Sequence, residues 1–159
     1  MSNGVKESVA VSTETETGFL VGRFDYSLDP KKRLTVPSTW RSALGNVMCV
    51  IPDRKERCLN LYPLAEMRVF IDQLRQKALL DPALNKVLLK IGAVSPQLTL
   101  DVQGRVRIND KLLQFANLTT TVAMVGSFRM VKLYNPELLG SGDEIDMSDV
   151  DAALSAAGL

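Results

Sequence analysis

Hydrophobic positions follow two different periods along this chain, and the change of period divides it into three regions. Over residues 24–63 apolar residues alternate with polar ones in short stretches, as at Leu34 and Val36, which predicts β-strands. Over residues 67–94 the apolar positions recur at the spacing of an amphipathic helix. Over residues 97–134 the alternation returns. The pattern therefore predicts two β-rich regions joined by helices.

The two β-rich regions are copies of one another at a constant offset. Residues 27–36, SLDPKKRLTV, and residues 99–108, TLDVQGRVRI, share a hydroxyl residue, Leu, Asp, three loop residues, Arg and an aliphatic–x–aliphatic stretch. The offset of 72 residues holds well beyond this motif. The matched pairs are Leu28 and Leu100, Asp29 and Asp101, Arg33 and Arg105, Leu34 and Val106, Val36 and Ile108, Val50 and Val122, Arg57 and Arg129, Leu59 and Val131, Leu61 and Leu133, and Tyr62 and Tyr134. Agreement in register over so long a stretch indicates two copies of one supersecondary unit.

Each copy predicts the same order of elements. An extended segment, residues 24–28 or 97–100, enters a turn at Asp-x-x-x-Arg, and a second strand leaves it. A short helix follows, beginning at Pro37–Ser38 in the first copy and around Asn109–Asp110 in the second, where either of these two side chains can cap it. Two further strands complete each copy, VMCVIP and CLNLYP in the first and TVAMVG and MVKLYN in the second.

The region between the copies predicts a pair of helices. The stretch LAEMRVFIDQLRQKALL places on one helical face Met67, Phe70, Ile71, Leu74 and Ala78. Asp81 and Pro82 interrupt this helix and can start a second one, which we expect to end at Gly92. We expect the apolar face to pack on the β-rich halves or on a neighbouring subunit. Membrane binding is disfavoured, because the polar face mixes both signs of charge.

These patterns predict an α+β fold with the following organisation. The expected segments are a disordered tail at 1–18, a first β unit at 19–66, a helical linker at 67–94, a second β unit at 95–139 and an acidic tail at 140–159, with a short helix near 148–157. A unit of about 45 residues seldom buries enough apolar area to fold alone. We therefore expect the copies to form one intertwined domain, whose exposed strand edges favour oligomers.

The charge distribution gives a modest indication of a polyanionic partner. The chain carries a net charge of +1, with −2 in residues 1–18 and −5 in residues 140–159, so the intervening 19–139 carries +8. A basic core with acidic ends favours a partner such as nucleic acid. On charge alone, we favour a mixed solvated surface over such a partner.

The composition disfavours several classes of function. The chain has no histidine, and its only cysteines are Cys49 and Cys58, so we expect no catalytic residues, no metal and no cofactor. The N-terminal segment lacks the order of a secretory signal, so we expect both cysteines to be reduced. No apolar run approaches the ~20 residues that span a bilayer, and we expect neither a membrane partner nor a small-molecule substrate.

The charged turns have two interpretations, and both stay open. An Asp that opens a tight turn accepts backbone N–H groups, and an Arg four residues later can pair with it, so Asp29 and Asp101 would orient their turns. This structural role alone is enough to select the motif. A turn held in this way can also present cations to the phosphates and guanines of DNA. The candidate DNA-binding residues are Lys31, Lys32, Arg33, Arg41, Arg105 and Arg107.

Four stretches of the chain resemble the MraZ family of bacterial transcriptional regulators. They are YSLDPKKRLTVPSTWR, CLNLYPLAEM, LDVQGRVRI and VAMVGSFRMVKLYNPE. The resemblance covers residues 19–138 in order. It implies two tandem AbrB-like (SpoVT-AbrB) units that form a swapped-hairpin β-barrel, and a ring-shaped homo-oligomer. It also implies binding to double-stranded DNA at direct repeats in the promoter of the division and cell-wall gene cluster, and a cytoplasmic, nucleoid-associated location.

The chain departs from the family pattern at several positions. Lys32 stands where the family usually has Gly. The second copy lacks the usual proline near residues 109–111 and has Leu113 in place of an Arg. We therefore expect the second copy to contact DNA more weakly than the first.

Three functions remain to be compared. We favour a sequence-specific DNA-binding regulator without catalytic activity. The alternative is an oligomeric protein-interaction scaffold that does not bind DNA directly. An enzyme on a small barrel is disfavoured, because the sequence offers no histidine and no pairing of nucleophile and base.

Overall fold

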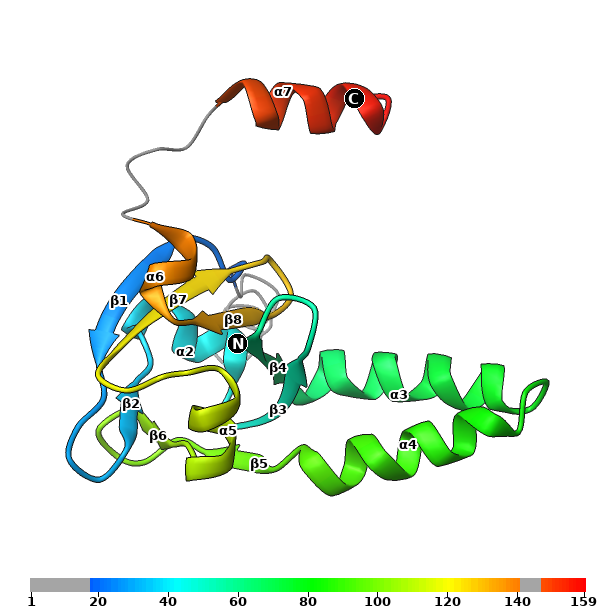
Figure 1. The fold of residues 1–159 in the computed structure, drawn as a ribbon, viewed down its shortest axis with the longest axis horizontal. Helices are drawn as coiled ribbons and strands as arrows, with labels where there is room; N and C mark the ends of the chain where they lie inside the picture. The colour runs from blue at the N-terminus through cyan, green and yellow to red at the C-terminus, as the bar shows by residue number, and fades with distance from the viewer. Residues whose placement is uncertain (1–17, 141–146) are drawn as a thin grey trace, which may run out of the picture.

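The computed structural model describes residues 18–140 and 147–159 of the chain (Figure 1). The first copy contains β1 (Arg23–Ser27), β2 (Arg33–Thr35), α2 (Ser38–Leu44), β3 (Val47–Asp53) and β4 (Cys58–Pro63). The helices α3 (Leu64–Ala78) and α4 (Ala83–Val94) follow. The second copy contains β5 (Gln97–Thr99), β6 (Arg105–Arg107), α5 (Asp110–Phe115), β7 (Thr121–Gly126) and β8 (Val131–Tyr134). Two further helices are α6 (Pro136–Leu139) and α7 (Met147–Ala156).

The predicted tails are only partly described. Apart from Gly18, the N-terminal tail expected at 1–18 lies outside the described residues, and so does the acidic stretch at 141–146. The short helix expected near residues 148–157 is α7, in which no residue is buried.

The strands form an antiparallel sheet in an α+β fold, as predicted, but this sheet is not closed into a barrel. The six-stranded sheet has the order β1-β7-β8-β4-β3-β5, so β1 and β5 are its edges. The short strands β2 and β6 form a separate two-stranded ribbon. Closure is absent because β2 and β6 pair with each other across residues 33–35 and 105–107 and do not join the two edges of the large sheet.

The two copies are interleaved within this architecture. Four strand pairs join one copy to the other, namely β1 with β7, β3 with β5, β2 with β6 and β4 with β8. Within the described part of the chain, only β3–β4 and β7–β8 pair within a copy. The order of the large sheet reads the same when each strand is exchanged for its equivalent in the other copy. Each copy therefore covers edges that the other leaves open.

The hydrophobic core fixes the ribbon against the large sheet. Leu34 and Val106 lie opposite one another in β2 and β6, and both are buried. Successive strand residues point to opposite faces, so their neighbours Arg33, Arg105 and Arg107 point away from this core. Trp40 is also buried, and its indole Nε1 donates to the carbonyl oxygen of Val21 at 2.8 Å.

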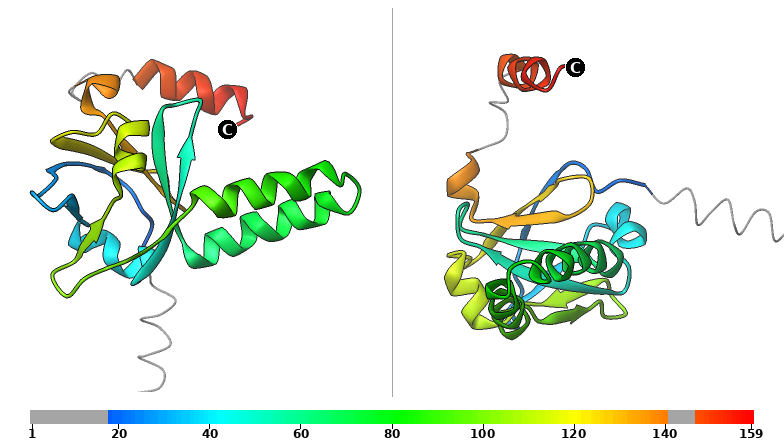
Figure 2. Two further views of the ribbon diagram at one scale, coloured as in Figure 1. Left: turned by 60° about the horizontal axis from the view of Figure 1, so that its bottom comes forward. Right: turned by 90° about the vertical axis from the view of Figure 1, so that its right-hand side faces the viewer.

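Helices α3 and α4 form an antiparallel hairpin that projects from the β-rich body (Figure 2). Only Met67 and Ala78 are buried in α3, and no residue is buried in α4. The carboxylate of Asp81 accepts the N–H of Ala83 at 3.2 Å where α4 begins. The prediction that Gly92 ends this helix is wrong, since α4 continues to Val94. In the described residues, no helix has the length and apolar character needed to cross a membrane.

Candidate nucleic-acid interface

The turn between β1 and β2 is built around the carboxylate of Asp29. Asp29 Oδ1 accepts the backbone N–H groups of Lys31 and Arg33, each at 2.9 Å. Asp29 Oδ2 accepts Nε of Arg33 at 2.6 Å. The backbone closes the same turn, because the N–H of Lys32 donates to the carbonyl oxygen of Asp29 at 2.9 Å. One side chain therefore fixes both the course of the turn and the position of its arginine.

The turn between β5 and β6 repeats this arrangement. Asp101 Oδ1 accepts the N–H groups of Gln103 and Arg105, each at 2.9 Å. Asp101 Oδ2 accepts Nε of Arg105 at 2.9 Å, and the N–H of Gly104 donates to the carbonyl oxygen of Asp101 at 3.0 Å. In both copies the aspartate thus accepts the hydrogen bonds that the structural interpretation of the Asp-x-x-x-Arg motif expects.

The hydrogen bonds hold both carboxylates in their charged form. Partial desolvation raises the pKa of Asp29, but the N–H of Arg33, the guanidinium of Arg33 and the N–H of Lys31 outweigh it. The pKa of Asp29 therefore lies below its usual value of 3.8. The N–H of Arg105 has the largest influence on Asp101, and it lowers the pKa of that carboxyl as well. Both turns keep their ion pairs at neutral pH.

The ribbon brings the two turns together on one side of the molecule. Arg33 lies opposite Arg107 in the register of β2 and β6, and Thr35 lies opposite Arg105. Arg105 Nη1 also lies 3.7 Å from Asp29 Oδ2, which is a contact between the two turns. The structure therefore gathers residues from both copies that are 70 to 76 positions apart in the sequence.

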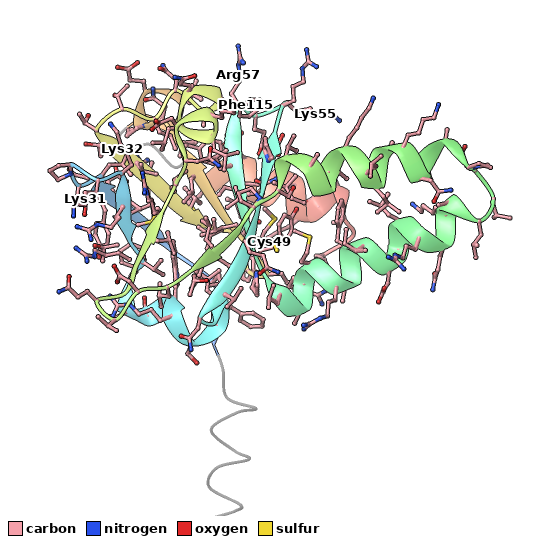
Figure 3. All side chains as sticks on the ribbon, turned by 90° about the horizontal axis from the view of Figure 1, so that it is seen from below. Lys31, Lys32, Cys49, Lys55, Arg57 and Phe115 are labelled. Carbon is pink, nitrogen blue, oxygen red and sulfur yellow. The ribbon has the colours of Figure 1, made fainter. Side chains whose placement is uncertain are left out.

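Not all predicted cations are equally available to a ligand. The side chains of Arg33 and Arg105 are 30% and 24% exposed, and each commits its Nε to an aspartate. Lys31, Lys32 and Arg107 are exposed. Lys31 and Lys32 extend from the body at the end opposite the α3–α4 hairpin (Figure 3). The lysines and Arg107 are thus the most open cations, while Arg33 and Arg105 also brace the turns.

Arg41 reaches the ribbon from α2. Its Nε donates to the carbonyl oxygen of Val36 at 3.0 Å, and its guanidinium lies directly against Gly104 in the turn of the second copy. A Cβ atom on Gly104 would come within 2.2 Å of Cζ of Arg41. Arg41 therefore belongs with the second turn in space, although the sequence places it just after the first.

A polar cluster that the sequence analysis missed lies across β3, β4 and β8. Nζ of Lys132 contacts oxygen atoms of Asp53 at 3.2 Å, Glu56 at 2.7 Å and Asn60 at 3.1 Å. The hydroxyl of Tyr134 donates to Glu56 Oε2 at 2.9 Å. Asn60 and Lys132 are equivalent positions of the two copies and lie opposite one another in β4 and β8. The equivalence of these two positions can be read from the sequence, but only the pairing of β4 with β8 shows that their side chains are in contact.

This cluster joins the two copies through an ammonium group held between carboxylates. Asp53, Glu56 and Cys58 lie close enough together to hold a metal ion, but the ammonium group of Lys132 already provides the positive charge between the two carboxylates. Burial raises the pKa of the Cys58 thiol to about 11, so it is protonated at neutral pH and is a poor nucleophile. Cys49 is likewise buried, and neither cysteine is in a disulfide.

Comparison with known proteins gives matches over much of the chain. Residues 19–89 match the family model described as "MraZ protein, putative antitoxin-like". The chain is 34% identical to a "Transcriptional regulator MraZ" of Salmonella typhi over 114 residues, which cover 69% of this chain and 74% of the relative. It is 28% identical to the protein of the same name from Clostridium beijerinckii over 141 residues, which cover 87% of this chain and 99% of the relative. The chain belongs to the MraZ family.

Proposed function

We propose that this protein is a transcriptional regulator that binds double-stranded DNA in a sequence-specific manner. The observation that carries the proposal is the β2–β6 ribbon, which joins two aspartate-braced turns and points basic residues away from the core. A rigid two-stranded ribbon has dimensions suited to a DNA groove. The net charge of +8 on residues 19–139 and the names of the relatives support the same function.

The proposed DNA contact of each basic residue follows from the exposure of its side chain and from its hydrogen bonds within the turn. Lys31, Lys32 and Arg107 are exposed and suited to phosphate contacts. Arg33 and Arg105 brace the turns with Nε and retain other N–H groups on the exposed part of the side chain. The proposed function needs no cofactor, metal or small-molecule substrate.

We further propose that the protein acts in the cytoplasm as a nucleoid-associated homo-oligomeric ring on direct repeats in the promoter of the division and cell-wall gene cluster. Helix α4 supports an oligomer, because none of its residues is buried and Leu89 is 77% exposed. Leu79 and Leu80 at the tip of the hairpin are also exposed. The open edges β1 and β5 offer further pairing surfaces.

A titration of matched charge variants tests the DNA-binding function. K31A/K32A removes two cations from the first turn, whereas K86A/K90A removes two exposed cations from α4. Binding to DNA from the gene's own upstream region is measured over a range of salt concentrations and compared with scrambled repeats. K31A/K32A should lower the affinity and reduce the salt slope by up to about two, because each lost phosphate contact removes about 0.9 from it. K86A/K90A should leave that slope unchanged.

Equal effects of the two double variants would contradict the proposed face. The scaffold alternative draws on the exposed apolar side chains of the α3–α4 hairpin. It would be favoured if the wild-type protein showed no salt-dependent DNA binding and co-purified with a protein partner through this hairpin.

A further inference from the structure

The DNA-facing side is divided into two halves, and each half combines a helix of one copy with a turn of the other. The N–H of Val36, just before α2, donates to the carbonyl oxygen of Gly104 in the second turn at 2.9 Å. The equivalent N–H of Ile108, just before α5, donates to the carbonyl oxygen of Lys32 in the first turn at 3.1 Å. The offset of 72 residues relates both bonds, so the halves can be compared position by position.

We name the halves by the cation that each presents. The Arg41 half contains α2 and the turn at residues 101–105, and the Lys32 half contains α5 and the turn at residues 29–33. In the Lys32 half, the position of Arg41 is occupied by Leu113, and the position of Gly104 is occupied by Lys32 itself. The two halves thus obtain a cation from different elements.

In the Arg41 half the guanidinium is fixed by its surroundings. Gly104 is buried with φ +79°, and it leaves room for the guanidinium directly against the backbone. The bond from Nε of Arg41 to Val36 sets the direction of the side chain. Among the described residues, the two terminal Nη groups of Arg41 have no hydrogen-bond partner. A planar fork of donors is therefore held in place with its ends unused.

In the Lys32 half the cation is exposed, and among the described residues no hydrogen bond or ion pair holds its ammonium group. Lys32 is exposed with φ +63°, whereas Leu113 is 4% exposed and belongs to the core. A hollow of about 330 Å³ lies beside them, with Asp110 and Gln114 in its lining. Asp110 stands where the other half has Ser38, so this half also places a carboxylate beside its cations.

Building on the proposed function, we infer that Arg41 is the specificity-determining residue for a guanine, and that the Lys32 half supplies sequence-independent phosphate contacts. A fixed guanidinium fork matches guanine O6 and N7 in a bidentate contact, while a mobile ammonium acts as a point charge. A backbone with two-fold pseudosymmetry would suit a palindrome. We infer that this chain instead recognises an asymmetric DNA site, in which base identity is specified only beside the Arg41 half.

Selection from a randomised double-stranded DNA library tests this assignment. The wild-type protein should select a motif whose base preference is confined to one side of each protomer's footprint and includes a guanine. R41K retains the charge but loses the fork. It should reduce the ratio of affinities for the selected and scrambled DNA by about five- to one-hundredfold. K32A should lower both affinities together and leave this ratio nearly unchanged.

Thermal unfolding of each variant shows whether it is folded, and the swap K32G/L113R gives an independent readout. A folded swap should select a symmetric motif, because both halves then pair Arg with Gly. A symmetric wild-type motif, or an R41K ratio equal to that of the wild type, overturns the inference while leaving DNA binding intact. Absence of salt-dependent binding to any member of the library by the wild type instead overturns the proposed function.

Discussion

The turns at residues 29–33 and 101–105 share their internal hydrogen bonds but differ in what surrounds them. In each turn one aspartate accepts two backbone N–H groups and the Nε of an arginine. Around the first turn lie an exposed lysine, a buried leucine and a nearby carboxylate, whereas an arginine from α2 covers the second. The comparison shows that the source of the cation beside a turn can differ while the bracing of the turn stays the same.

The largest predicted effect breaks both turns together by weakening the ribbon beneath them. Leu34 is fully buried opposite Val106, so L34A removes apolar contacts and leaves a cavity. We expect the free energy of unfolding to fall by about 2–5 kcal/mol, as measured by urea denaturation. V102A, at a fully exposed position in the second turn, is the control and should change it by less than about 0.5 kcal/mol. Equal midpoints for L34A and V102A would show that the ribbon does not hold the turns.

A second prediction separates the turns by changing the residue with positive φ in each of them. G104A places a Cβ at φ +79° and displaces the guanidinium of Arg41, so it should destabilise the protein by about 1–2 kcal/mol. K32G should change the free energy of unfolding by less than about 1 kcal/mol. Glycine relieves the backbone strain of a side chain at φ +63°, but it also gives the unfolded chain more freedom, and the two effects offset each other. Urea denaturation measures both. If the two variants have the same effect, Arg41 does not distinguish the halves.

The smallest predicted effect concerns acid and should be similar in both turns. The pKa values of Asp29 and Asp101 are lower in the folded protein than their usual value of 3.8. A lowered pKa means that the unfolded chain binds protons first, so these groups stabilise the fold above about pH 4. That contribution is lost as the pH falls through the folded pKa. D29N and D101N should each flatten the dependence of unfolding free energy on pH below about 4.

The sequence predicted local structure better than it predicted contacts between copies. A side-chain cap of α5 was predicted at Asn109 or Asp110, and it is Asn109 that accepts the N–H of Leu112 at 2.9 Å, a contact within one turn of helix. Gly92 was expected to end its helix on residue type alone, but α4 continues through Gly92 to Val94. The open sheet was not foreseen, since strand order depends on pairings between distant segments. The hydrogen bonds of each Asp and Arg were predicted because they span only four residues.

The missed features of the candidate site have one cause. Arg41 follows the first turn in sequence, and nothing in that stretch indicates that it covers Gly104 of the second. Lys132 and Asp53 likewise meet only where β3 and β4 approach β8. Equivalent positions could be matched from the repeat, but the crossing of the copies could not. The repeat therefore predicted the elements of each copy, but not which helix and which turn lie together in one half.

The interleaving of the copies also has a consequence for how the chain emerges during synthesis. While the first copy is exposed alone, β3 and β4 can form a hairpin, but β1 must wait for β7, where Arg23 meets Val125. Pairings across so long a loop form slowly. The nascent first half therefore leaves the ribosome with unpaired strands, and the helices at residues 64–94 set the delay before their complement arrives.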